Sequence, residues 1–513
     1  MFEIKFSLST QTKPNPMKSK LLHIPLLALL FSYLFTERSV GINLIAFHSA
    51  ALAFIVYHKP ERQWSRHQIL LFSSSVSLLL FSFLHYSTWA MAWSWIALGT
   101  TAIVFQSNEV RQIALSTLSA FTGAFITPIQ FISKITKRVF HGTPRKASAF
   151  LYVIPVLAIG VFSLLYAQAN PDIDKAFRLV TGHFFESIAQ FFSNFFSPSF
   201  WMTLLGVVIG SILLYGKFLS AYRHTNQIKN DDLKRERNPY PGSVDVLKTY
   251  YKSAVYTVGS LIVVLSGFLF FEIRDVWINF EWNGGELKYF VHSGTYILIF
   301  SIIISALLIL VFFNNRLNFY PDNKLRRLSY IWLILNGVLA ASVIVRTMHY
   351  IDNFALAYLR IGVIFFILAC FAGLYSVYLK IKQRKSFNYL LHFNSISVLV
   401  VVLVISSVNW DRVITQYNFN HSKKAFVHLR YLSEMSDKTL PLLVRNADEL
   451  EELKTTQEQL SHLDTRSSYY ITKEDYQLRI EQRIERFNQK WESKSFWEWN
   501  LPEYLAYHEL NRK

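Results

Sequence analysis

Cysteine is almost absent from this sequence of 513 residues, and charged residues are few. The single cysteine, Cys370, excludes an intramolecular disulfide and a metal site built from paired cysteines. Asp, Glu, Lys and Arg make up 17% of the chain, compared with roughly 25% in an average soluble protein. Hydrophobic residues make up 52%, with 44 phenylalanines among them, and this excess favours a protein that lies mostly in lipid.

Signatures of common enzyme classes are also absent. There is no P-loop, nucleophile elbow, HExxH helix, GxGxxG turn or paired-cysteine zinc pattern. The 15 histidines are scattered, and we interpret His48 and His85, within or at the end of apolar runs, as hydrogen-bonded structural residues. The sequence therefore predicts no catalytic residue, no cofactor and no metal site, which favours a non-enzymatic role.

The sequence contains instead a series of long apolar runs. A helix needs roughly 20 apolar residues to cross about 30 Å of hydrocarbon, and lipid offers no partner to unpaired backbone groups. Eleven runs qualify: 21–36, 42–57, 68–85, 88–105, 148–167, 199–216, 253–272, 293–313, 329–346, 357–379 and 389–408. We therefore predict an all-α fold, in which residues 21–410 form a polytopic transmembrane helical bundle of about 11 spans.

Lysine and arginine are concentrated in every second gap between these runs. Before residue 411 the chain has 36 of them, and 29 lie in the segments 1–20, 58–67, 106–147, 217–252, 314–328 and 380–388. Basic residues stay on the cytoplasmic side of a membrane. The N-terminal tail, 1–20, is therefore expected in the cytoplasm, and an odd number of spans puts the C-terminus outside. In a bacterial cell this predicts a multi-pass inner-membrane protein with a periplasmic C-terminal part.

The net charge of +18 also raises the alternative of a nucleic-acid-binding protein. From Asp411 onward, however, the chain has 16 Lys and Arg against 17 Asp and Glu, so the excess positive charge lies in the apolar part. Membrane orientation explains that distribution. We expect the lipid bilayer as a partner and no nucleic acid, and the sequence identifies no protein partner.

Residues 411–513 form a more polar segment with helical spacing. Apolar residues recur every three or four positions in 448–463 and 474–491. Thr472, with Asp475 three residues later, has the pattern of a helix N-cap. About a hundred residues suffice for a small fold. We therefore predict a small C-terminal helical domain on the extracytoplasmic side.

Two further apolar segments are expected to lie on the membrane surface. Residues 112–132 have basic flanks and contain Pro128, so we interpret them as an amphipathic segment on the cytoplasmic face or one that dips in and out. Residues 172–196 carry an apolar residue every three or four positions, which predicts a helix on the outer leaflet. A lid over a site between the spans is the alternative for this second segment.

A polar cluster between the spans 329–346 and 357–379 is the candidate functional site. It comprises Arg346, Tyr350, Asp352 and Arg360. A charge inside an apolar run is costly and normally finds a partner, and Asp352 is the nearest candidate for Arg360. One interpretation is a polar site, open to the outside, that recognises an anion or moves a proton. The other is that Arg346 and Arg360 snorkel to the interface and only fix the hairpin.

The stretch YIDNFALAYLR in this cluster resembles a bacterial multi-pass membrane family known as a domain of unknown function, the 4153/4173 group. There the hairpin reads approximately Tyr, three variable residues, aromatic-Gly-Leu-Thr, two more residues and then Arg. The matching positions are Tyr350, Phe354, Leu356 and Arg360. Ala355 and Ala357 stand where the family has Gly and Thr.

Three other segments resemble the same family, so that the resemblance covers about residues 150 to 445. They are Ala169–Pro171, Asn409–Asn418 with Trp410 in place of a proline, and Tyr431–Leu443. The resemblance implies a membrane protein whose activity is not established, and it supplies no reaction.

Three functions remain open. The first is a non-enzymatic membrane component whose spans present the periplasmic helical domain for assembly or signalling. The second is a transporter with a polar site near the 346–360 hairpin, which inverted repeats would favour, although we find no internal repeat. The third is an intramembrane enzyme acting on a lipid-linked substrate, which would need an acid/base pair of which Asp352 is a single member. The absence of catalytic motifs favours the first.

Overall fold

The computed structural model describes residues 16–58, 63–106, 112–122, 198–215, 231–233, 243–280, 285–313, 316–460 and 472–512. Throughout these ranges the regular structure is helical, apart from one isolated bridge between Asp232 and Lys385. The chain divides into two compact units. The first comprises residues 1–69, 98–108 and 117–219, and the second comprises 70–97, 109–116 and 220–513.

The first unit contains α1 (Pro16–Phe35), α2 (Ile42–Tyr57) and α8 (Pro198–Tyr215). Helices α1 and α8 pack closely because α8 presents the small residues Gly206 and Gly210, four positions apart. A Cβ atom on Gly206 would lie 2.8 Å from the Cα atom of Ala28, so only glycine permits this approach. The hydroxyl of Ser32 donates to the carbonyl of Ser199 at 3.0 Å, which joins the same two helices.

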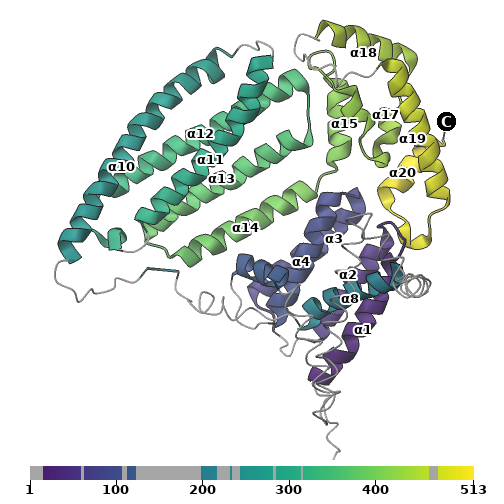
Figure 1. Ribbon diagram of the computed structural model, residues 1–513, viewed down its shortest axis with the longest axis horizontal. Coiled ribbons are helices and arrows are strands. Elements are labelled where there is room, and N and C mark those ends of the chain that lie inside the picture. The colour runs from purple at the N-terminus through teal and green to yellow at the C-terminus, as the bar shows by residue number, and fades with distance from the viewer. Residues whose placement is uncertain are drawn as a thin grey trace, which may run out of the picture. The chain divides into compact units, whose positions relative to one another are not determined.

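The second unit is dominated by five long helices that lie side by side (Figure 1). They are α10 (Ser243–Glu272), continued by the π-helix η1 (Ile273–Ile278), and α11 (Gly285–Phe312), α12 (Lys324–Phe354), α13 (Tyr358–Gln383) and α14 (Phe387–Ser406). Between α11 and α12 runs the short helix η2 (Arg316–Phe319). The outer faces of the five long helices carry exposed apolar side chains, among them Val263 and Ile297, which are 72% and 63% exposed. Such faces suit a lipid surrounding.

Among the described residues, seven helices are long and apolar enough to cross a membrane: α3 (Arg66–His85), α4 (Thr88–Gln106) and α10 to α14. The protein is therefore a helical membrane protein. The predicted runs coincide with helices in ten cases, and the remaining run, 148–167, lies outside the described residues. Because α1, α2 and α8 are shorter apolar helices, the total of eleven spans stays a prediction.

The two segments predicted on the membrane surface are described only in small part. Residues 113–122 form one short apolar helix, and residues 123–132 lie outside the described residues. The segment 172–196 lies outside them entirely. The segment 217–252, which is expected to join two spans, is helical in its last part, because α10 begins at Ser243, before the predicted run 253–272.

The C-terminal segment consists of short helices and one longer helix of 20 residues. They are α15 (Trp410–Asn420), α16 (Leu429–Ser433), η3 (Asp437–Thr439), α17 (Leu440–Leu443), α18 (Ala447–Gln459), α19 (Lys473–Glu492), η6 (Phe496–Glu498) and α20 (Leu501–Leu510). Its core, which includes Ile414, Leu440 and Tyr476, also takes in Ala355 and Ile361 from the α12–α13 hairpin. The segment therefore falls within the second unit, and the domain boundary at residue 411 stays a prediction.

The predicted N-cap of the long C-terminal helix is confirmed. The hydroxyl oxygen of Thr472 accepts a hydrogen bond from the backbone N–H of Asp475 at 3.0 Å. This bond satisfies one of the amides that a helix leaves unpaired in its first turn.

Candidate functional site

Arg346 forms a bidentate ion pair with Glu272, the last residue of α10. Its Nε and Nη2 atoms donate to the two carboxylate oxygens at 2.6 and 2.5 Å, and both side chains are 3% exposed. The hydroxyl of Ser342 donates to the same carboxylate at 2.5 Å and accepts from the indole N–H of Trp277 at 3.1 Å. Glu272, which the sequence prediction did not consider, is therefore the partner of this arginine. Two parallel charge-assisted bonds fix the relative positions of α10 and α12.

The backbone changes its winding directly after Glu272. Residues Ile273–Ile278 form a π-helix, a feature that often marks functional sites within α-helices. The imidazole Nε2 of His349 on α12 donates to the carbonyl of Val276 at 2.9 Å, and its ring stacks on Phe280 at 4.0 Å. The π-helix is therefore held against α12, next to the Glu272–Arg346 ion pair.

Arg360 lies in the first turn of α13 and caps the end of α12. Its Nη1 atom donates to the carbonyl of Phe354 at 2.7 Å and to that of Ala355, and its guanidinium lies 4.3 Å above the ring of Tyr350. These carbonyls are among those that a helix end leaves without a partner. Ala355 adopts φ 58° and ψ −166°, a conformation that strongly favours glycine.

The four residues of the predicted cluster thus do not form one site. Tyr350 and Arg360 are in contact, Arg346 lies one helical turn away on Glu272, and the Asp352 side chain is exposed. Whether the cluster has a function stays a prediction. The prediction missed Glu272, although this acidic residue closes the predicted span 253–272, which is expected to end on the same side of the membrane as the predicted span 329–346.

A cavity of about 40 Å³ adjoins Arg360. Three helices, α11, α12 and α13, supply its walls. The lining residues are Thr295, Tyr296, Thr347, Tyr350, Leu359, Arg360 and Val363.

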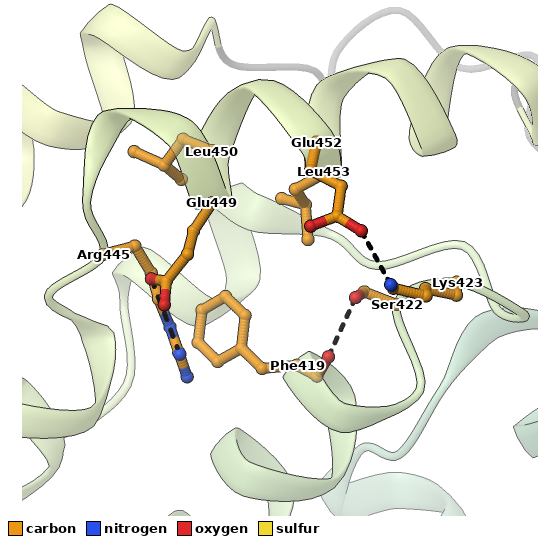
Figure 2. Close-up of a pocket in the computed structure, with 8 residues that line it drawn as sticks. All are labelled: Phe419, Ser422, Lys423, Arg445, Glu449, Leu450, Glu452 and Leu453. Carbon is orange, nitrogen blue, oxygen red and sulfur yellow. Dashed lines mark hydrogen bonds and ion pairs between the residues drawn. The ribbon is translucent and has the colours of Figure 1, made fainter.

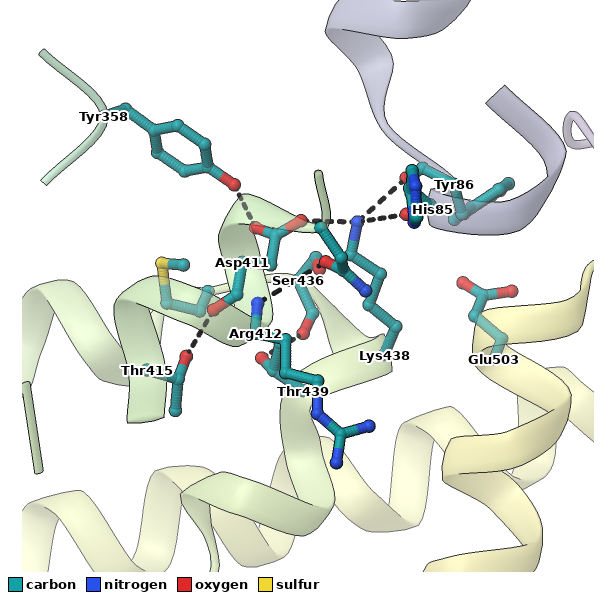
Figure 3. A network of polar contacts seen from close by, with 12 residues as sticks. His85, Tyr86, Tyr358, Asp411, Arg412, Thr415, Ser436, Lys438, Thr439 and Glu503 are labelled. Atoms are coloured by element: carbon teal, nitrogen blue, oxygen red, sulfur yellow. Dashed lines mark hydrogen bonds and ion pairs between the residues drawn. The ribbon is translucent and has the colours of Figure 1, made fainter. Parts of the chain in front are cut away.

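A second buried network joins the C-terminal segment to the ends of membrane helices (Figure 3). The carboxylate of Asp411 accepts from the hydroxyl of Tyr358 and pairs with the ammonium of Lys438. Lys438 also donates to the backbone carbonyls of His85 and Tyr86, at 2.6 and 3.1 Å. The side chains of Lys438 and Asp411 are only 2% and 13% exposed. One lysine therefore connects the α3–α4 turn to α15 and η3.

Further polar contacts hold the same junction. Asn418 on α15 exchanges two hydrogen bonds with the backbone of Leu356, at 2.7 and 3.0 Å. The backbone N–H of Phe426 donates to the carbonyl of Asn353 at 2.8 Å. Burial, and to a lesser extent the carboxylate of Glu503, raises the pKa of Tyr86, so its hydroxyl stays neutral at physiological pH.

The helices α19 and α20 are fixed by two more ion pairs. Lys494 pairs with Glu503, both side chains being 7% exposed, and Asn500 donates to the same carboxylate at 2.6 Å. Arg483 on α19 pairs with Asp437 of η3 at 2.5 Å. Sequence reasoning missed these pairs because their members are separated in the chain and no motif marks them.

A larger pocket, of about 160 Å³, lies between α15 and α18 (Figure 2). Phe419, Leu450 and Leu453 give it an apolar lining. Its two cations each have an acidic neighbour: Lys423 pairs with Glu452 at 2.7 Å and Arg445 with Glu449 at 3.8 Å. Because these charges balance within the pocket, its electrostatics favour no ionic ligand.

Comparison with known families gives one match. A family profile described as "Domain of unknown function (DUF4153)" matches residues 40–446. No curated protein and no solved structure matches the chain. The matched range begins just before α2 and ends after α17, so it includes the Glu272–Arg346 pair and the Asp411–Lys438 network.

Proposed function

This chain belongs to the family described as Domain of unknown function (DUF4153), and from that premise we propose that it is a non-enzymatic, multi-pass membrane component. In this proposal about eleven spans hold the C-terminal segment, residues 411–513, on the periplasmic side of a bacterial inner membrane. There the segment serves assembly or signalling. The family name assigns no activity, so the proposal rests on the contacts of the described residues.

The observation that carries the proposal is the buried network around Lys438. A segment that merely trails from the last span needs no charged contact with earlier helices. Here Lys438 is buried against Asp411 and against two carbonyls of the α3–α4 turn. Breaking such a pair leaves an uncompensated charge, so the segment is held in a defined position. A surface held in this way suits recognition by another protein.

The distribution of contacts supports the proposed orientation. Segments expected outside meet one another: the His85–Tyr86 turn, the α12–α13 hairpin and the C-terminal segment. Segments expected inside also meet one another. Gln112 donates to the carbonyl of Asn388 at 3.2 Å, and Lys385 pairs with Asp232 at 2.7 Å. This separation is what the alternation of basic loops predicts.

Reporter fusions test the topology. A reporter fused after residue 388 is expected to give a cytoplasmic signal, and one fused after residue 430 an extracytoplasmic signal. A cytoplasmic signal from both fusions would refute the odd number of spans and the periplasmic position of the segment.

The presenting role is tested by complementation of a deletion strain. Lys438→Met should loosen the C-terminal segment and weaken complementation while the amount of inserted protein stays normal. Lys423→Met is the matched control, since Lys423 is 74% exposed and should behave as the natural chain. If limited proteolysis shows that the segment is released in Lys438→Met but complementation is complete, the presenting role is wrong.

A transporter is a second candidate, favoured by the Glu272–Arg346 pair inside the candidate spans. Ionisable residues at that depth often mark ion or substrate pathways. Replacing both members by leucine removes the charges and leaves no uncompensated partner. Loss of complementation by Glu272→Leu/Arg346→Leu at normal abundance would favour transport, whereas full complementation would favour the presenting role.

A further inference from the structure

The buried cations of the second unit are compensated in two ways. Arg346, Lys438 and Lys494 each pair with a carboxylate, whereas Lys380 donates to two backbone carbonyls. Arg360 belongs to the second kind: it has two backbone carbonyls and the ring of Tyr350, and no carboxylate in the described part of the chain lies within ion-pair distance of it. A full positive charge therefore stands at the end of an apolar helix with only partial negative charges around it.

The cavity beside this charge has the size and chemistry of a small anion site. The carbonyls of Phe354 and Ala355 and the hydroxyl of Tyr350 engage three of the five N–H donors of Arg360, which leaves two further donors. Thr295, which is 6% exposed, adds a hydroxyl to the lining. A volume of about 40 Å³ holds roughly three water molecules at about 10–15 Å³ each. This space accommodates the oxygens of one phosphate group.

The outer rim of the cavity faces the surface that lipid would cover. Leu359 is 67% exposed and Tyr296 is 53% exposed, and both belong to candidate spans. Helix α13 has 26 residues, so it is about 39 Å long at 1.5 Å per residue, longer than the roughly 30 Å of hydrocarbon. A helix of this length extends beyond the hydrocarbon, and its first turn, which contains Arg360, can then lie at the depth of the lipid headgroups.

We propose that this cavity, between α11, α12 and α13, binds the phosphate group of an anionic phospholipid through Arg360. The acyl chains then lie along Tyr296, Leu359 and Val363, and the phosphate supplies the negative charge that the protein does not. The inference is independent of the proposed presenting role, since it requires only that these helices lie in a membrane.

The test is native mass spectrometry of the full chain released from detergent micelles after titration with phosphatidylglycerol. Diacylglycerol with the same acyl chains is the probe that lacks the phosphate. The natural chain is expected to retain phosphatidylglycerol and not diacylglycerol. Arg360→Gln keeps an amide donor for the α12 carbonyls and removes the charge. It is expected to weaken phosphatidylglycerol retention about tenfold, in line with the loss of one charge-assisted contact.

A control and a second variant keep the proposal open to refutation. Arg430→Gln removes an arginine that is 47% exposed on α16 and should retain the lipid normally. If Arg360→Gln does not fold, Thr295→Val is used, which removes the lining hydroxyl and should weaken retention several-fold. Displacement of the lipid by excess inorganic phosphate would support the same phosphate site with the free ion as its ligand. Equal retention of phosphatidylglycerol by the natural chain and by both cavity variants would overturn the proposal.

Discussion

The Glu272–Arg346 pair allows a quantitative prediction, because both side chains are 3% exposed and the pairing is bidentate. Arg346→Leu leaves the carboxylate of Glu272 buried with only the hydroxyl of Ser342 as a donor among the contacts described above. Removing one member of a buried pair typically costs about 3–5 kcal/mol. We expect Arg346→Leu to lower the free energy of unfolding by that amount.

The double variant Glu272→Leu/Arg346→Leu separates the net contribution of the ion pair to stability from the cost of leaving one charge without its partner. Replacing a buried pair by apolar residues of similar size is often neutral or stabilising by about 1–4 kcal/mol. Glu272→Leu/Arg346→Leu should therefore recover most of the stability lost in Arg346→Leu. The assay is unfolding by a denaturing detergent in mixed micelles, followed by circular dichroism. A double variant that is no more stable than Arg346→Leu would refute the reasoning, because the two losses would then be independent of the pairing.

Three further predictions concern other parts of the chain. Lys438→Met removes the cation that pairs with the nearly buried carboxylate of Asp411, so the C-terminal segment should lose roughly 3 kcal/mol of stability. The loss is measured as faster cleavage in limited proteolysis. Burial raises the pKa of Tyr476 above its ordinary 10.0, so its contribution to stability is full below pH 10 and is lost as the pH rises further; Tyr476→Phe should reduce this alkaline loss in thermal unfolding at a series of pH values. Gly206→Ala places a methyl group 2.8 Å from the backbone of Ala28 and should lower the melting temperature, whereas Gly259→Ala, with open space around it, should not.

The helices were largely predictable from the sequence, because a segment that crosses lipid has few alternatives to an α-helix. An apolar run long enough to span must be helical, and this rule located helices at ten of the eleven runs. The boundaries were less predictable. Helix α12 continues past the expected end at Arg346 as far as Phe354, since the turn is made by the backbone conformation of Ala355, which hydropathy does not report.

The candidate site was predicted only in part, for a physical reason. The cost of a charge in lipid pointed to Arg346 and Arg360, but not to their partners. Glu272 lies 74 residues before Arg346 in the chain and meets it only when α10 packs on α12. Asp352 is close in sequence, yet its position on the helix leaves it exposed. Asp352 was the partner expected for Arg360, but Asp352 lies on α12 and Arg360 on α13, beyond the turn at Ala355, so closeness in the sequence did not bring the two side chains together.

The conformation of Ala355 has a consequence for how this hairpin varies between relatives. A residue with a Cβ atom in this region of backbone space costs about 1–3 kcal/mol, and the resembling family has glycine at the corresponding position. In this chain Arg360 donates hydrogen bonds to the carbonyl of Phe354 and to that of Ala355 itself. Alanine at position 355 is thus expected only together with arginine at position 360. Glycine at 355, as in the resembling pattern, is compatible with arginine at 360 or with its loss.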